Sequence, residues 1–284
     1  MDLDGVGSGI RGRALLLVLA AIPIAAWSGP SGAAGNAPAS SSEERAIDPP
    51  EPSPPPRVAL KWTAGLDVSR GDYGFDQPTT LYYVPLGVTG DLGRFRARLI
   101  LPLLASDGPV RIDPGSGTTG RTGTDSDVTV GLGQMQVSAG YLVDPLFEGM
   151  PWVELTGRLT LPTETSEALG TGDVAFAAQI DLFERIGLVT PFVSLGRKWY
   201  DSAGLRDRFY TSLGASIAFG ERTSAGLAWD WLESTSNAAA DAHDLVPFFS
   251  FDVTSATNLA PYVVIGLSEG SPDWGLGVTV SVRR

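Results

Sequence analysis

The side chains that carry most enzyme chemistry are scarce in this sequence. It contains no Cys and one His, which excludes a thiol nucleophile, a thiolate metal site and a multi-histidine metal site. His243 lies beside Asp241 and Asp244, and Ser234 is close in sequence. Such residues could form a Ser hydrolase site, in which a histidine base is held next to the nucleophile. A histidine in an exposed loop is more often inert, so the sequence predicts a protein that is not an enzyme and that needs no metal or cofactor.

Charged residues at every second position are the other group that could act on a solute. Arg94, Arg96 and Arg98 alternate with apolar residues, and alternate residues of a strand point to the same face. Charges that share one face can select or orient charged solutes. The charges that share the polar phase of their segments are predicted to line the interior of the fold: Lys61, Arg94, Arg96, Arg98, Arg158, Asp173, Asp181, Arg208, Asp230 and Asp252.

An alternation that repeats every two residues places these charges along the chain. Apolar and polar residues alternate clearly in six segments, at 57–68, 95–103, 153–161, 174–182, 209–219 and 274–282. None of the residues on the apolar phase of these segments is charged, although 18% of the chain is. Strands of about ten residues that alternate in this way are typical of transmembrane β-barrels.

Weaker strands and the connections between strands complete the predicted fold. Six further strands are expected at 80–88, 133–143, 188–200, 225–233, 245–253 and 259–267, with the phase left open in 188–200 and in the last two, where Pro residues interrupt them. Short and long connections alternate, as they do where short turns face the periplasm. A sheet in hydrocarbon must close, because unpaired backbone groups are costly there. The sequence therefore predicts an all-β fold, a transmembrane antiparallel up-and-down β-barrel of about 12 strands at 57–284.

Two segments precede the predicted barrel. Residues 1–34 combine Arg11 and Arg13 with an apolar run and a following stretch of small residues, which is typical of a secretory signal peptide. The apolar run is too short for a membrane-spanning helix. Residues 35–56 are rich in Pro and Ser and are predicted to form a periplasmic linker, because Pro removes backbone donors and favours extended chain.

Charge and location indicate the partners. A net charge of -12 argues against a nucleic-acid partner, which requires a basic surface. The bacterial outer membrane is the predicted location, with its lipids and small-molecule solutes as partners. The predicted outer loops are acidic, so divalent cations are a further candidate, and solubilising loop tips are the alternative. The acidic loop residues are Asp72, Asp76, Asp107, Asp113, Asp125, Asp127, Glu164, Glu167, Asp241, Glu269 and Asp273.

Short motifs rich in Gly and Pro resemble a known family. They are Gly-Asp-Tyr-Gly at 71–74, Tyr-Val-Pro-Leu at 83–86, Leu-Gly-Thr-Gly-Asp at 169–173 and Thr-Pro-Phe at 190–192. From about Leu60 onward the chain resembles the outer-membrane proteins of the MetA pathway of phenol degradation family. The resemblance implies a barrel of about 12 strands that takes up small molecules, aromatic ones among them, and it brings no catalytic residues. Gln134 stands where we expect Asp, and the last residue, Arg284, is not the aromatic common in such barrels.

The number of strands and the inward charges predict the function. About 12 strands fall between small barrels filled by their own side chains and wide open channels, so a narrow lumen is expected. Arginines on the third strand would face Asp230, Asp244 and Asp252 on the ninth and tenth strands, either as a field across the lumen or as pairs that rigidify it. The predicted function is a porin-like channel for small solutes, aromatic or organic compounds among them. The alternatives are a polypeptide export pore gated by the N-terminal segment, an outer-membrane hydrolase and a soluble β-protein.

Overall fold

The computed structural model describes residues 58–284 except 75, 114–116, 122–127, 148, 202–203 and 237–238, and it describes only the backbone of 110–113 and 117–121. The predicted signal peptide at 1–34 and linker at 35–56 lie outside the described residues, as do Asp125 and Asp127.

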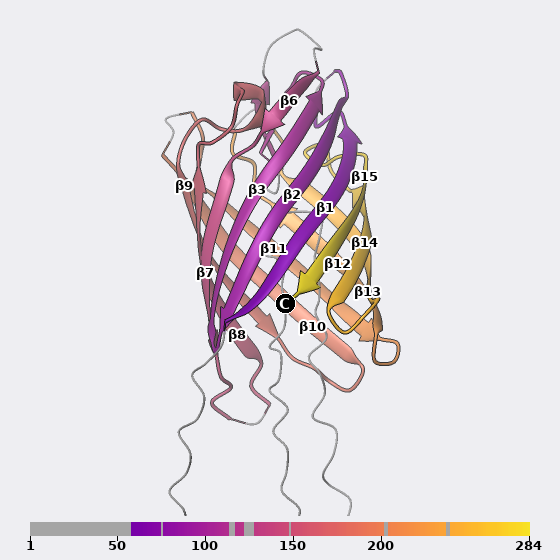
Figure 1. Cartoon of the computed structure of the whole chain (residues 1–284). Coiled ribbons are helices and arrows are strands. Elements are labelled where there is room, and N and C mark those ends of the chain that lie inside the picture. The colour runs from indigo at the N-terminus through magenta and orange to yellow at the C-terminus, as the bar shows by residue number, and fades with distance from the viewer. Residues whose placement is uncertain are drawn as a thin grey trace, which may run out of the picture.

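The described residues form a closed antiparallel β-barrel with twelve wall positions (Figure 1). The positions follow the chain in order, and the barrel closes where β1 pairs with β15. One position is shared by two short strands, β6 (Thr129–Leu132) and β7 (Met135–Val143), which both pair with β3. The other strands are β1 (Ala59–Gly71), β2 (Thr79–Leu92), β3 (Phe95–Asp107), β8 (Trp152–Leu161), β9 (Ala175–Phe183), β10 (Val189–Tyr200), β11 (Arg208–Ala218), β12 (Thr223–Leu232), β13 (Ala242–Asp252), β14 (Thr257–Gly266) and β15 (Trp274–Arg283).

The two faces of the wall differ in polarity, as the alternation predicts. On β11, Phe209, Leu213 and Ile217 are exposed on the outside of the barrel. Arg208, Ser212 and Ser216 are buried on the inside of the same strand. A charged or polar inner face and an apolar outer face are the arrangement of barrels that sit in a bilayer.

The two ends of the barrel also differ. Five connections at one end are short, at 93–94, 144–151, 184–188, 219–222 and 253–256, and we call this the short-turn end. Connections at the other end, the long-loop end, are mostly longer, at 72–78, 108–128, 162–174, 201–207, 233–241 and 267–273. The first strand begins and the last strand ends at the short-turn end, because the number of wall positions is even.

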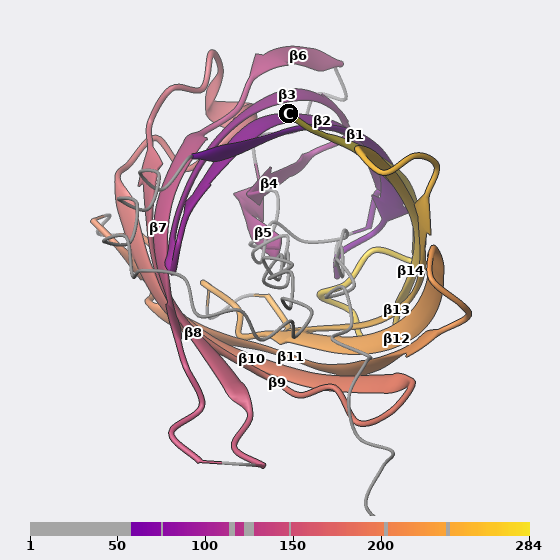
Figure 2. The ribbon, with the colours of Figure 1, turned by 60° about the horizontal axis from the view of Figure 1, so that its bottom comes forward.

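Three features were not predicted. The strand expected at 133–143 begins at Met135, and Gly133 and Gln134 separate it from the unpredicted strand β6. The inner face changes from odd residues in β6 to even residues in β7. The connection at 108–128 contains a hairpin of β4 (Val110–Asp113) and β5 (Gly117–Arg121), which Figure 2 shows inside the ring of strands. A short 3-10 helix, η1 (Glu167–Leu169), lies in the connection between β8 and β9.

Aromatic side chains on the inner face lie across glycines of the neighbouring strand. Tyr262 of β14 covers Gly277 of β15, and its hydroxyl donates to Asp67 Oδ2 of β1 at 2.9 Å. Tyr210 of β11 covers Gly196 of β10 in the same way and donates to Gln179 Oε1 of β9 at 3.2 Å. A Cβ at either glycine would overlap the ring. Each ring therefore lies along the wall and joins three strands, the first of them across the closing seam.

Candidate functional site: the inner wall and the mouth of the barrel

Most of the charges predicted to line the interior lie on the inner face of the wall. Lys61, Asp181, Arg208 and Asp230 are buried there, on β1, β9, β11 and β12. Arg96, Arg98 and Arg158 are half-buried on the inner face of β3 and β8. These seven residues come from strands spread around the barrel, so the charge is not confined to one side.

Three predicted residues lie at the rims and not on the wall. Arg94 is exposed in the turn between β2 and β3, where it forms an ion pair with Asp144 of the next turn. Asp252 ends β13 at the short-turn end and accepts a hydrogen bond from Asn258 Nδ2 at 3.0 Å. Asp173 precedes β9 at the long-loop end, and its backbone carbonyl accepts from Gln134 Nε2 at 3.1 Å.

The structure adds three inner-wall charges that the prediction left out. Asp67, Glu154 and Lys198 are buried on β1, β8 and β10, and Asp244, which was expected to face the lumen, is buried on β13. Asp67 and Glu154 stand on the polar phase of their segments, so the alternation could have identified them. The phase of the strand that carries Lys198 could not be assigned, because Pro191 interrupts its pattern.

Arg96 is the centre of a local ion-pair network. Its Nε lies 2.7 Å from Asp91 Oδ1, and its Nη1 lies 3.0 Å from Glu154 Oε2. Arg98 donates from Nε to Thr89 Oγ1 at 3.2 Å. Arg96 thus pairs with carboxylates of its own part of the wall.

The expected pairing of opposite stripes across the lumen does not describe Arg96, Arg98 and Asp230. Arg96 and Arg98 lie near the start of β3, which begins at the short-turn end. Asp230 lies near the end of β12, which finishes at the long-loop end. These residues are on opposite strands but at different heights, because strand direction and register, not strand number alone, determine the height of a residue. Asp252 lies at the short-turn end like the arginines, and it accepts a hydrogen bond from Asn258.

An apolar patch occupies another part of the inner wall. Phe183, Phe192, Val246, Phe248 and Val264 are buried together with Ala228 and Tyr262, with Leu142 and Trp152 packed beside them. These residues come from β7 to β10 and from β12 to β14. The inner wall is therefore amphipathic, which makes it suited to contact solutes that carry both apolar and polar groups.

The connection between β8 and β9 is docked into the mouth of the barrel at the long-loop end. Leu169 of η1 is buried against inward residues of β2 and β3, among them Leu81, Tyr83 and Leu104. Thr165 Oγ1 accepts from Leu132 N at 3.1 Å, and Thr163 Oγ1 accepts from Met135 N at 2.8 Å. The loop thus pairs with the interruption between β6 and β7 and narrows the mouth.

Gln134 fastens this loop from the wall. Its Nε2 donates to Thr171 Oγ1 at 3.0 Å and to the Asp173 carbonyl, and Thr171 Oγ1 donates back to its Oε1 at 3.2 Å. An Asp at this position has no amide donor, so it could not make the two bonds that Nε2 donates. The departure from the expected Asp thus has a structural role here.

We expect Gln134→Leu to release the loop. The change removes the amide that holds Thr171 and Asp173, and leaving buried polar groups unpaired costs about 1–3 kcal/mol. A protease that cleaves after Glu should then cut at Glu164 and Glu167, and single-channel conductance should rise. Gln136→Leu is the matched control, because Gln136 is buried on the same face two residues away and makes no hydrogen bond to the loop within the described residues. Equal protection in both variants would contradict the tethering role.

His243 does not form a hydrolase site with the nearby serines. Its ring lies on the outer face, stacked on Trp229 at 5.7 Å between ring centroids. Ser234 Oγ donates to the Ser236 carbonyl at 2.8 Å. Ser268 and Ser271 contact the backbone of His243, not its imidazole. A nucleophile and its base must be within hydrogen-bond reach, and these described residues do not meet that condition.

No three His, Asp or Glu side chains within the described residues lie close enough together to hold a metal ion. The expectation that divalent cations bind at the acidic outer loops stays a prediction, since parts of three of those loops lie outside the described residues.

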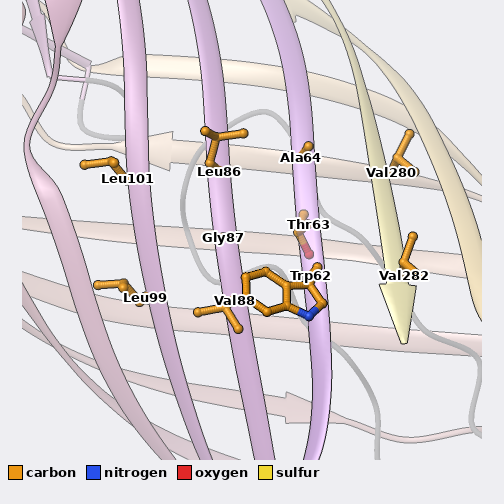
Figure 3. A pocket seen from close by; sticks show the side chains of 10 residues that line it. All are labelled: Trp62, Thr63, Ala64, Leu86, Gly87, Val88, Leu99, Leu101, Val280 and Val282. Carbon is orange, nitrogen blue, oxygen red and sulfur yellow. The ribbon is translucent and has the colours of Figure 1, made fainter. Parts of the chain in front are cut away.

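The outer face of the barrel carries an apolar groove. It crosses β15, β1, β2 and β3, and Figure 3 shows its side chains, all of them apolar except Thr63. Trp62, Leu86, Leu99 and Val282 are exposed on the outer face. The groove therefore belongs to the apolar coat and is not part of the lumen.

The described residues contain no helix that is both long and apolar enough to cross a membrane.

Comparisons with solved structures agree with the fold. The chain is similar to the COG4313 outer membrane channel from Pseudomonas putida F1, with 15% identity and a TM-score of 0.62 over 84% of this chain and 100% of that one. Weaker similarities include the KdgM porin in complex with disordered oligogalacturonate, with 8% identity and a TM-score of 0.46 over 79% of this chain and 98% of that one. Another is the CymD monoaromatic hydrocarbon channel, with 9% identity and a TM-score of 0.41 over 81% and 88%. At such low identity the likeness shows the fold, a barrel shared with outer-membrane channels.

No family model matches the sequence, and no curated protein matches it.

Proposed function

We propose that this protein is a porin-like channel of the bacterial outer membrane, which passes small solutes through a narrow charged lumen. The closed barrel with an apolar outer coat and a charged inner wall carries the proposal. Exposed apolar side chains need lipid around them, and buried charges need water or a charged solute beside them. A barrel that sits in the bilayer, with a passage along its axis, meets both needs: lipid surrounds the outer side chains, and water or a solute reaches the inner charges.

The mouth and the inner wall limit the solutes. The docked loop that carries Leu169 narrows the long-loop end, and the β4–β5 hairpin lies within the ring. The buried patch around Phe192 and Phe248 makes part of the inner wall apolar, which suits organic molecules, aromatic ones included. These features support passage of small organic solutes over large or fully hydrophilic ones.

Liposome swelling with the purified chain tests the proposal. We expect neutral solutes of increasing size to enter protein-containing vesicles at rates that fall steeply with size, because the mouth is narrow. Vesicles with heat-denatured protein are the control, and folded protein is verified by heat-modifiable migration on a gel. Vesicles that admit none of the solutes despite folded protein would contradict a channel.

A further inference from the structure

Five inner-wall cations lie in one continuous line of facing residues. Following the register from strand to strand, Lys61 faces Thr89, Thr89 faces Arg98, Arg98 faces Ser138, and Ser138 faces Arg158. The line continues from Arg158 through Ala177 and Lys198 to Arg208. No carboxylate occurs in it. We call Lys61, Arg98, Arg158, Lys198 and Arg208 the cation row.

The cation row connects the two ends of the barrel. Lys61 lies near the start of β1, at the short-turn end, and Arg208 is the first residue of β11, at the long-loop end. A line of facing residues runs perpendicular to the strands, and the strands of such barrels tilt by about 35–45°. The row therefore rises along the wall. Neighbouring strands lie about 4.8 Å apart, so the first four cations, which stand on every second strand, are spaced by about 10 Å. Lys198 and Arg208 stand on adjacent strands and face each other directly.

A second line carries the opposite charge. Glu154 faces Asp181, and Asp181 faces Ser194. The line continues through Ser212 to Asp230 and Asp244. It begins near the start of β8, at the short-turn end, and reaches β13 at the long-loop end. We call Glu154, Asp181, Asp230 and Asp244 the acidic row.

The two rows run parallel on β8 to β11. Along β8, Glu154 precedes Arg158 by four residues, and Ser194 and Lys198 have the same separation on β10. Four residues of a strand span about 13 Å. The line between the rows is uncharged on these strands and consists of Thr156, Gln179, Gly196 and Tyr210. Long Arg and Lys side chains can narrow the gap towards the carboxylates.

Three of the five cations form no ion pair within the described residues. Lys61 and Arg208 are only 5% and 2% exposed, yet neither they nor Arg158 form an ion pair there. Three buried polar atoms of the two rows have no hydrogen-bond partner in the described part of the chain. They are Arg208 Nε, Asp230 Oδ1 and Asp244 Oδ1. Buried charges of this kind are costly unless a counter-charge reaches them. Arg208 in the cation row and Asp230 and Asp244 in the acidic row thus have bonding capacity left for a solute.

We infer that the two rows form a paired track for small zwitterions, whose carboxylate follows the cation row while their ammonium group follows the acidic row. The inference rests on the proposed channel function and specifies its substrate class. Two parallel stripes of opposite sign produce a field between them that orients a dipolar solute, and such a field favours it over a neutral solute of the same size. A solute with a single charge is attracted by one row and repelled by the other.

Selectivity for simple ions tests the rows separately. In planar bilayers under a KCl gradient at about 0.1 M, where screening is incomplete, the wild type should be only weakly selective, because five cations stand against four carboxylates in the two rows. K61Q/R158Q should shift the potassium-to-chloride permeability ratio towards potassium by about threefold, and D230N/D244N should shift it as far towards chloride. Arg197→Gln is the control for position, because it removes one positive charge from the outer face beside Lys198 and should leave the ratio unchanged. Unchanged ratios in both double variants would overturn the inference.

Swelling rates for two isomers test the substrate class. β-Alanine is a zwitterion and lactamide is its neutral isomer. Because the two have nearly the same size, the ratio of their swelling rates reports the effect of charge. Wild-type vesicles should admit β-alanine about two to five times faster, and either double variant should bring the ratio close to one. R158K keeps the charge and should retain the preference, which separates lost charge from poor folding. Entry of lactamide with no dependence of the ratio on the rows would overturn the zwitterion track but not the channel, whereas entry of neither isomer would contradict the channel.

Discussion

Replacement of Leu155 by Arg is expected to destabilise the barrel in a bilayer by about 2–4 kcal/mol. Leu155 lies near the centre of β8 and is exposed on the outer face, where it faces Tyr141 and Ile180 of the adjacent strands. If this face lies in hydrocarbon, a charge there must be desolvated or must distort the bilayer to reach water.

Thr156→Arg is the matched control for this position. Thr156 is the next residue of β8 and lies on the inner face, between Glu154 and Arg158. An arginine there remains in the polar interior beside a carboxylate, so the expected cost is below about 1 kcal/mol. Urea titration of refolding into vesicles measures both variants. Equal costs would mean that the outer face does not contact lipid, and would favour a soluble β-protein.

Gly277→Ala is expected to destabilise the barrel by about 2–4 kcal/mol. The new Cβ would overlap the ring of Tyr262, which must then leave the wall and give up its hydrogen bond to Asp67. That bond reaches from β14 over β15 to β1, so its loss weakens the seam at which the first and last strands meet. The displaced ring should also enter the lumen and lower the conductance.

Gly157→Ala separates this effect from the general effect of alanine in a strand. A Cβ at Gly157 would make only ordinary contact with Phe176, so the stability should stay within about 1 kcal/mol of the wild type. The temperature at which the band shifts in heat-modifiable migration compares the two variants. If Gly277→Ala and Gly157→Ala unfold at the same temperature, the ring of Tyr262 does not stabilise the seam between the first and last strands.

The strands and their inner and outer faces could be predicted from the sequence, because a wall between lipid and lumen imposes a period of two. Lys61, Asp181, Arg208 and Asp230 lie on the inner face for this reason. The alternation of short and long connections predicted the two ends. The phase of Lys198 could not be assigned, since Pro191 breaks the pattern on which the assignment depends.

The arrangement of the charges could not be predicted, because it depends on register. The pattern within β3 places Arg98 on the inner face but says nothing of which residue of β8 lies level with it. Only the stagger of successive strands brings Arg98 and Arg158 into one line through Ser138. The docking of the loop around Leu169 depends likewise on an interruption at Gly133 and Gln134, which appeared in the sequence only as a departure from a family pattern.

The course of the cation row has a consequence for how a solute moves. Between Lys61 and Arg208 the row crosses seven of the twelve strand-to-strand steps that close the barrel. A solute that keeps its carboxylate on this row must rotate by more than half a turn about the barrel axis while it moves along that axis. Short molecules can make this motion freely. A rigid solute that lies across the axis can do so only if it is shorter than the bore is wide, so the channel would discriminate such solutes by length as well as by cross-section.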